Sequence, residues 1–266
     1  MTTFQKTVKY AAMALAIFLS ISIVSGIVDV LAIFTRVYES DAVLDETTKY
    51  SVSSEITDLK VNIKAADFTI KRGDTFTVES NLKNLKISEK NGTLELKEKK
   101  KASVLYNGAV LILYIPDSVT FNKAEITTGA GKFTVDGMSA ENLALSLGAG
   151  DVELNSLNST SFTDIDGGAG RITIKNSSFR DVDLDMGVGQ LNFNASVFGD
   201  GNFNLGVGEA NLSFIGNEED YSTDIDKGIG SISVNGRNIT EYETHGGKLG
   251  NIEIDGGVGT VNMNFI

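Results

Sequence analysis

The sequence contains no cysteine, no tryptophan, one proline and one histidine. Without cysteine the chain can form no disulfide, no thiolate metal site, no cysteine nucleophile and no lipid-modified N-terminal cysteine. This absence suits a bacterial surface protein. The one histidine, His245, stands beside two glycines and has no identifiable nucleophile partner, so we interpret it as a surface or turn residue.

Basic residues are also scarce. Lysine and arginine number 23 against 35 aspartates and glutamates, which gives a formal charge of −12. A negative charge of this size argues against nucleic acid and anionic lipid as the main partners of the chain. The excess of acid lies entirely in the second half: residues 35–126 carry 14 basic and 14 acidic side chains, whereas residues 127–266 carry 7 and 20.

One long hydrophobic run is present, at residues 10–34, and Asp29 is its only charge. A bilayer core of about 30 Å requires roughly 20 apolar helical residues, so the run predicts a transmembrane signal anchor in contact with the lipid bilayer. Lys6 and Lys9 precede the run and acidic residues follow it. This asymmetry places residues 1–9 in the cytoplasm and the rest of the chain outside.

The alternative is a cleaved signal peptide, because the small residues between Ser20 and Gly26 offer a weak cleavage site. We favour the uncleaved anchor because the apolar run continues well past those residues. Either interpretation puts most of the chain outside the cytoplasm.

Residues 35–50 are typical of a polar stalk or linker, and residues 51–126 of a β-rich cap. Asn91-Gly92, between two alternating runs, strongly indicates a β-hairpin turn. Residues 98–101, EKKK, are typical of a solvated loop rather than a binding patch. The alternating runs that predict strands in the cap are residues 59–63, 68–70, 76–78, 85–87, 94–96 and 110–115.

Residues 127–266 repeat a motif G-Φ-G, in which Φ is apolar, about every 19–20 residues. Strict alternation of apolar and polar residues leads into and out of the copies, which predicts two half-buried strands per repeat. A degenerate copy at residues 248–250 lies half a period before the last full copy. The glycines of the full copies are Gly129, Gly131, Gly148, Gly150, Gly168, Gly170, Gly187, Gly189, Gly206, Gly208, Gly228, Gly230, Gly257 and Gly259.

Two strands per repeat fit either an antiparallel meander or a β-solenoid, also described as β-helix-like. We favour the solenoid because Φ is always aliphatic, whereas an exposed hairpin tip favours Asn, Asp or Gly. The flanking glycines would allow a positive φ and close stacking of the coils. This interpretation points Φ side chains such as Ala169 and Val188 inward. Six to seven coils would form a rod roughly 30–35 Å long.

Four segments resemble, in this order, the bacterial putative-adhesin family of β-strand-repeat proteins, a domain of unknown function. The resemblance covers the chain from about Tyr50 to the C-terminus. It implies an all-β repeat ectodomain, often behind one N-terminal membrane helix, and it brings no catalytic residues. The segments are YSVSSEITDLKVNIKAADFTIKRGDTFTV, NGTLELKEK, LILYIPD and ITTGAGKFTVDGMSAENLALSLGAGDVEL.

The G-Φ-G copies do not predict a dinucleotide site, because each opens a strand instead of a helix and no glycine follows three residues later. The run at residues 167–170 begins like the motif of calcium β-rolls, but Ile172 stands where that motif has aspartate. We therefore expect no cofactor and no standard calcium site.

Acidic pairs precede the first glycine of several repeats by four and two residues. A solenoid would stack them into an outward acidic ladder, interrupted by Asn202 and Asn204. The simplest interpretation is a solvated face that blocks lateral strand association. The alternative is weak binding of divalent or polycationic ligands, among which Ca²⁺ suits oxygen ligands. The ladder residues are Asp164, Asp166, Asp183, Asp185, Asp224, Asp226, Glu253 and Asp255.

An enzyme that cleaves polysaccharides is a further alternative, because Asp183 and Asp185 are close enough on one strand to form a carboxylate pair. The repeat half, however, has only seven basic residues to bind an anionic sugar and no tryptophan on which a sugar ring could stack. We therefore predict a function without catalysis.

Together these patterns predict a single-pass protein of the bacterial cell envelope with a cytoplasmic N-terminus and an extracytoplasmic β-repeat ectodomain. The ectodomain would act as an adhesin, or as a binding or scaffold surface for an unknown envelope protein or surface ligand. The alternative is an accessory role in envelope-stress sensing. That role would require a membrane partner, because about nine cytoplasmic residues cannot form a signalling domain.

Overall fold

The computed structural model describes residues 46–266 except residues 53–54, 100–107, 227 and 241. The predicted anchor at residues 10–34 lies outside this part of the chain. Across the described ranges, no helix is long and apolar enough to span a membrane. The chain divides into the units Met1–Ala42 and Val43–Ile266, and the second unit contains every described element and the whole described core.

Strands make up most of this unit, so the predicted all-β class is confirmed. The strands are β1 (Thr48–Ser51), β2 (Asp58–Ala65), β3 (Asp67–Gly73), β4 (Thr77–Ser80), β5 (Leu85–Lys90), β6 (Thr93–Glu98), β7 (Val110–Pro116), β8 (Phe121–Phe214), β9 (Tyr221–Asp226), β10 (Ile229–Val234), β11 (Arg237–Ile239), β12 (Tyr242–Thr244) and β13 (Gly250–Phe265), with the 3₁₀ turn η1 (Glu218–Asp220) before β9.

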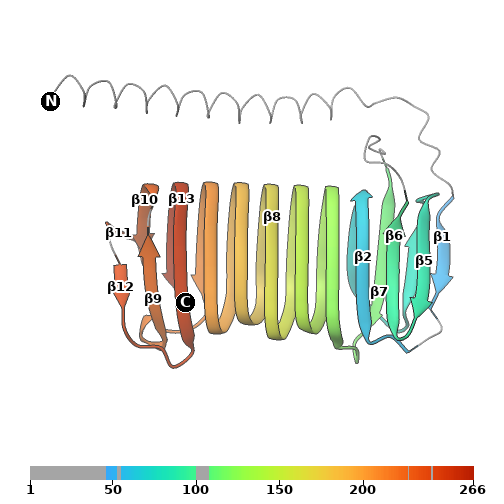
Figure 1. Cartoon of the computed structure of the whole chain (residues 1–266), viewed down its shortest axis with the longest axis horizontal. Helices are drawn as coiled ribbons and strands as arrows, with labels where there is room; N and C mark the ends of the chain where they lie inside the picture. Colours follow the sequence, from blue (N-terminus) through green and yellow to red (C-terminus); the bar gives the residue numbers. More distant parts are fainter. Residues whose placement is uncertain (1–45, 53–54, 100–107, 227, 241) are drawn as a thin grey trace, which may run out of the picture. The chain divides into compact units, whose positions relative to one another are not determined.

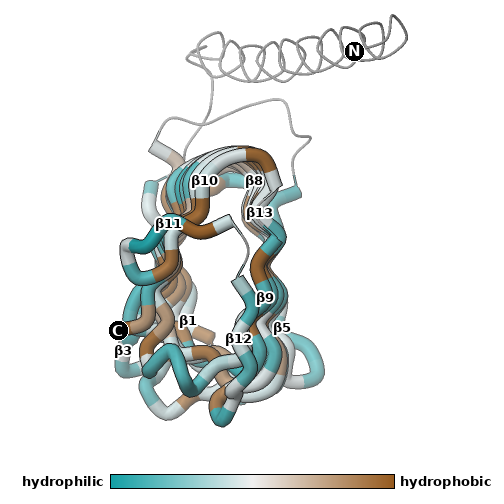
Figure 2. Tube along the Cα trace, turned by 90° about the vertical axis from the view of Figure 1, so that its left-hand side faces the viewer, coloured by the Kyte–Doolittle hydropathy of each residue, from teal (hydrophilic) through white to brown (hydrophobic). Residues whose placement is uncertain are grey.

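The strands form a stack of flattened coils, which superimpose as an elongated ring when viewed along the stack (Figures 1 and 2). In each coil one side leads into a G-Φ-G corner and the other leaves it; we name these the leading side and the trailing side. β8 winds through the middle of the stack as 94 residues of continuous extended chain. Its coils follow one another in sequence order, and each corner lies on the corner one repeat earlier, as Gly148 lies on Gly129 and Gly168 on Gly148.

At the N-terminal end of the stack the coils do not follow the sequence order. β2 and β3 form a coil that pairs in parallel with β8, with Ala65 opposite Ala130. β6 and β7, which come later in the chain, pair in parallel with the outer edges of β2 and β3. Antiparallel strands then cover this end: β5 lies on β6, β4 on β7 and β1 on β4. Residues 48–50, which the sequence assigned to the stalk, belong to β1.

The C-terminal end shows the same inversion. β13 pairs in parallel with the last coil of β8 on one edge and with β9 and β10 on the other, so the final coil lies between two earlier ones. β12 covers β9 and β11 covers β10, both antiparallel. Gly250 pairs with Gly199, at the far end of the leading side, so the prediction of a degenerate corner at residues 248–250 was wrong. Gly250 stands half a period before the last G-Φ-G copy because the two lie at opposite ends of the same coil side.

The alternating runs predicted in the N-terminal part lie in β2 to β7, except that Phe76 stands one residue before β4. One cluster of buried side chains fills the interior of the stack. Asn91 and Gly92 have φ of 51° and 76° and join β5 to β6 in the predicted hairpin. Glu98, however, is 3% exposed, and its carboxylate accepts the backbone N–H groups of Lys64 and Ala65 at 2.8 and 3.2 Å. The prediction of a solvated loop was therefore wrong for Glu98, which holds the corner of the β2–β3 coil.

Candidate functional site

The G-Φ-G corners form one long edge of the stack. The second glycine of every copy has a φ between 123° and 151°, a region that residues with a Cβ rarely adopt. A Cβ added to Gly189 would lie 1.8 Å from the carbonyl oxygen of Gly170, and one added to Gly187 would lie 2.3 Å from that of Gly168. Both glycines of a copy therefore let the coils approach more closely than any side chain would allow.

The prediction that Φ points into the core was wrong. Ala169 is exposed and Val188 is half-buried, while Val207, Val258 and Ile229 expose 40%, 48% and 73% of their surface. The inward-facing alternation stops one residue before the first glycine and resumes two residues after the second. The corner between these points lies outside the core, so Φ contacts solvent.

The largest Φ residues are neighbours in space. Val258 pairs with Val207, and Ile229 pairs with Val258, so three successive rungs expose aliphatic side chains at the C-terminal end of the edge. We name these three residues the aliphatic ridge. A contiguous exposed apolar surface commonly marks an interaction site. The hollow beside it has a volume of ≈ 20 Å³, about the size for one water, and a second hollow further along the edge, around Ala149 and Ala169, has the same volume. This edge therefore suits surface contact rather than a small-molecule substrate.

The acidic pairs lie on the leading side, next to this edge. The register sets the Glu253 and Asp255 rung between the asparagine rung and the Asp224 and Asp226 rung, because β13 is inserted there. Asn204 donates a hydrogen bond to Asp185 across 2.6 Å. In spatial order the rungs are Asp164 and Asp166, Asp183 and Asp185, Asn202 and Asn204, Glu253 and Asp255, and Asp224 and Asp226.

The carboxylates of neighbouring rungs repel one another. Burial raises the pKa of Asp164, and the charges of Asp166, Asp183 and Asp185 raise it further. Burial likewise raises the pKa of Asp183, together with the charges of Asp185 and Asp166. In the part of the chain that the structure describes, no three acidic or histidine side chains converge into a group that could hold a metal. The ladder is therefore a line of negative charge. A cation would reduce the repulsion between its carboxylates, but the ladder would not enclose that cation.

The trailing side differs, because its polar side chains pair with one another. Arg171 lies 3.5 Å from Asp151, and its Nε donates to Gln190 across 3.1 Å. One row further on, the amide of Asn211 donates to Asn192 across 3.1 Å. Such amide and ion pairs connect successive coils, whereas the leading side keeps much of its charge uncompensated.

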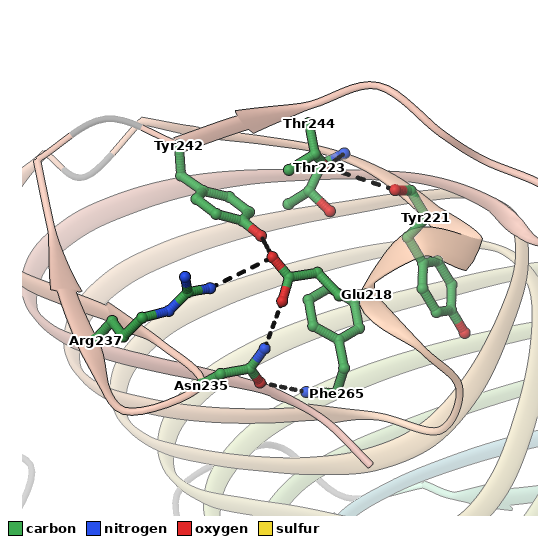
Figure 3. A network of polar contacts seen from close by, with 8 residues as sticks. All are labelled: Glu218, Tyr221, Thr223, Asn235, Arg237, Tyr242, Thr244 and Phe265. Atoms are coloured by element: carbon green, nitrogen blue, oxygen red, sulfur yellow. Dashed lines mark hydrogen bonds and ion pairs between the residues drawn. The ribbon is translucent and has the colours of Figure 1, made fainter.

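A polar network closes the C-terminal end of the stack (Figure 3). The Glu218 carboxylate accepts hydrogen bonds from the Tyr242 hydroxyl and from the amide of Asn235, the latter at 2.7 Å, and lies 3.5 Å from Arg237. Burial, together with the hydrogen bond to Glu218 and its charge, raises the pKa of Tyr242 to about 12. Sequence reasoning missed this network because its members are far apart in the chain and form no motif.

None of the three residues considered for catalysis lies in an enclosed site. Asp183 and Asp185 project from the leading side as part of the ladder, and Asp185 contacts Asn204. His245 has a side chain that is 84% exposed and lies 3.5 Å from Glu243, which agrees with a surface residue.

The sequence matches the Toastrack DUF4097 family over residues 79–253. No curated protein matches it. Solved structures that resemble the chain include a putative cell adhesion protein from Clostridium sporogenes, with 17% identity, a TM-score of 0.35 and coverage of 83% of this chain and 99% of that one. They also include putative adhesins from Bacteroides fragilis (12% identity, TM-score 0.39, coverage 82% and 95%) and Parabacteroides distasonis (16%, 0.45, 83% and 96%). The family match spans well over half of the chain, and the protein therefore belongs to the Toastrack DUF4097 family, whose function is unknown.

Proposed function

We propose that this protein is a non-enzymatic binding or scaffold protein of the bacterial cell envelope, anchored by residues 10–34 with its β-stack outside the membrane. It holds its partner along the G-Φ-G edge. The observation that carries this proposal is the aliphatic ridge, because three adjoining rungs expose side chains of which Ile229 is 73% accessible.

The surroundings of the ridge indicate the chemistry of the partner. The acidic rungs formed by Glu253, Asp255, Asp224 and Asp226 lie beside it on the leading side. A complementary partner would present an apolar strip bordered by basic groups, since apolar contact supplies affinity and opposite charge speeds association and fixes orientation. Adhesion to another surface and contact with a membrane protein of the same cell are both compatible with such an edge.

Site-directed photo-crosslinking in intact cells tests the proposal. A photoreactive residue at Val258 or Ile229 should capture the same partner, because both side chains face one surface. The matched control is Lys175, an exposed position on the trailing side at the end away from the corner. Capture at all three positions alike, or at Lys175 alone, would contradict a binding site on the ridge.

The adhesion and sensing roles give different results in a second experiment. Replacing Val207, Val258 and Ile229 by asparagine, with residues 1–50 unchanged, should reduce attachment of cells to their target surface if the protein is an adhesin. In the sensing role attachment stays unchanged, and the crosslinked partner is a protein of the same membrane. Membrane insertion is measured separately, by extraction of the full chain with alkaline carbonate.

A further inference from the structure

An open groove of ≈ 620 Å³ lies at the N-terminal end of the stack, between β1 and β5. Val52, Leu85 and Ile87 form its apolar part, and all three are half-buried against the core. Tyr50, which is 46% exposed, and the exposed Lys86 and Lys99 also line it. Lys83 and Glu89 complete its charged lining, so the groove combines an apolar surface with an aromatic side chain and an excess of positive charge.

The lysines of the β5–β6 hairpin are not explained by the stability of the fold. Lys86 stands directly opposite Lys97, and like charges in opposed positions destabilise a hairpin. Neither of them has an ion-pair partner among the residues that the structure describes. A lysine on an edge strand such as β5 blocks unwanted strand pairing, but β6 is paired on both edges, so this explanation does not cover Lys97.

The position of the groove in the chain indicates what covers it. β1 lines the groove and begins at Thr48, and 13 residues separate it from the hydrophobic run that ends at Phe34. Thirteen extended residues reach about 45 Å at most. With the run inserted in a bilayer, the groove is within reach of the headgroups of that bilayer.

The charge distribution gives the protein a preferred orientation at an anionic surface. Residues 127–266 carry 7 basic and 20 acidic side chains, whereas residues 35–126 are balanced. A negatively charged bilayer would repel the acidic repeats and attract the lysines around the groove, since each basic residue near such a surface adds attraction within a Debye length. The net charge of the whole chain therefore does not prevent binding through this one end.

We propose that the groove docks on the anionic phosphate headgroups of the bilayer that the anchor enters. Lys86 and Lys99, which line the groove, and the exposed Lys97, which stands opposite Lys86 just outside it, contact the phosphates. Tyr50 lies at the interface, and the acidic repeats extend away from the membrane. The proposal rests on the proposed membrane anchor for its biological setting. It concerns a different surface from the aliphatic ridge, which remains free to bind the partner.

Vesicle sedimentation of the Val43–Ile266 unit tests the proposal without the anchor, since this unit contains the whole described core. We expect it to bind vesicles of phosphatidylcholine with 30% phosphatidylglycerol at least tenfold more strongly than vesicles of phosphatidylcholine alone. The double substitution Lys86→Glu and Lys97→Glu should lower binding about 10- to 30-fold, because each basic residue near the surface contributes roughly fivefold. Salt at 0.5 M should abolish the difference.

The matched control is Lys175→Glu with Arg180→Glu, which makes the same change in net charge at exposed positions of the repeats. It should bind nearly as well as the parent, and thermal unfolding should show that both variants fold. Equal binding by the two double variants, or binding independent of phosphatidylglycerol, would overturn the proposal. Dimers that form through the groove would also overturn it. Carbonate extraction of the full chain tests the anchor alone, so the two proposals fail separately.

Discussion

The middle of the stack and its two ends are built by different rules. In β8 each coil follows the previous one in sequence and rests on it through the same pair of glycines. At the N-terminal end the β2–β3 coil lies between β8 and the later β6–β7 coil, and at the C-terminal end β13 lies between β8 and the earlier β9–β10 coil. Antiparallel strands cover the outermost edges. A stack of parallel coils cannot end on its own repeat, because the last coil would present unpaired backbone groups to solvent and to other chains.

The side chains reflect this difference. The middle is held by periodic contacts that recur at every rung, whereas each end contains one glutamate that contacts several partners. Glu98 accepts two backbone N–H groups from the β2–β3 coil, and Glu218 connects Tyr242, Asn235 and Arg237 around the last coil. A repeat is thus specified by a local motif, while its termination is specified by individual long-range contacts.

The strongest test of this comparison replaces a glycine in the middle and a glycine at the end. Gly189→Ala should destabilise the protein by about 4 kcal/mol or more, because the new Cβ would lie 1.8 Å from the Gly170 carbonyl oxygen at a φ of 143°. Gly236→Ala should cost only about 1 kcal/mol, since its φ is also positive, at 73°, but nothing lies within 4 Å of the added Cβ. Denaturant unfolding of both variants measures the difference.

The Gly236 variant is the control for a Cβ added at positive φ, and its φ of 73° lies in the left-handed region, which is less restrictive than the φ of 143° at Gly189. If the two substitutions cost the same, strain at positive φ would dominate, and close stacking of the glycines would not limit the spacing of the coils.

The sequence predicts the middle of the stack well because the motif and the alternation repeat there at a fixed period. Alternation identifies the strands, and Asn91-Gly92 identifies the hairpin, since both signals depend on neighbours in the chain. The order of the end coils could not be predicted, because the motifs around Gly228 and Gly257 are equivalent and either could follow β8. Strand pairing decides which of the two coils lies against β8. That pairing depends also on β11 and β12, which cover the outer edges of β10 and β9.

The surface was predicted less well than the strands. The acidic rungs were found because a two-residue period fixes which side chains point outward. The direction of Φ was misjudged because the corner interrupts the alternation. The last inward side chain stands one residue before the first glycine, so the two-residue period no longer applies at Φ. Ile229 and Val258 were therefore assigned to the core, although the structure exposes them at the edge.

A medium effect is expected at the C-terminal end. Tyr242→Phe should destabilise the end coils by about 1 kcal/mol, because it removes a hydrogen bond to the Glu218 carboxylate. Hydrogen exchange should accelerate in β9 and β12 while β8 stays protected, since the middle does not depend on this network. Equal acceleration in β8 would show that the stack unfolds as one unit.

The same tyrosine has a pH signature. The pKa of Tyr242 is raised to about 12 in the folded state, against about 10 in an unfolded chain. Its contribution to stability is therefore complete below pH 10 and is lost as the pH rises towards 12. Ultraviolet titration should show one tyrosine ionising near pH 12, and this step should be missing in Tyr242→Phe.

The smallest effect is expected on the acidic ladder. The double substitution Asp164→Asn and Asp183→Asn should raise the melting temperature at pH 7 by roughly 1–3 °C, because it removes two carboxylates whose charge is disfavoured by partial burial and by their acidic neighbours. Asn202 and Asn204 already occupy the equivalent positions in the next rung, so asparagine fits there. Asp151→Asn is the control, since that carboxylate lies 3.5 Å from Arg171 and its removal should bring no gain.

The pH dependence identifies the cause of the gain. Because the pKa of both aspartates is raised in the folded protein, the native state binds more protons than the unfolded chain at pH values between the unfolded and folded pKa. Stability therefore falls as the pH rises through this window, and the penalty is complete above it. The advantage of the double variant should persist at pH 7 and vanish below about pH 3, where the carboxyl groups are neutral in both states. A gain that is unchanged at low pH would mean that asparagine hydrogen bonds along the ladder, rather than relief of repulsion, stabilise the coils.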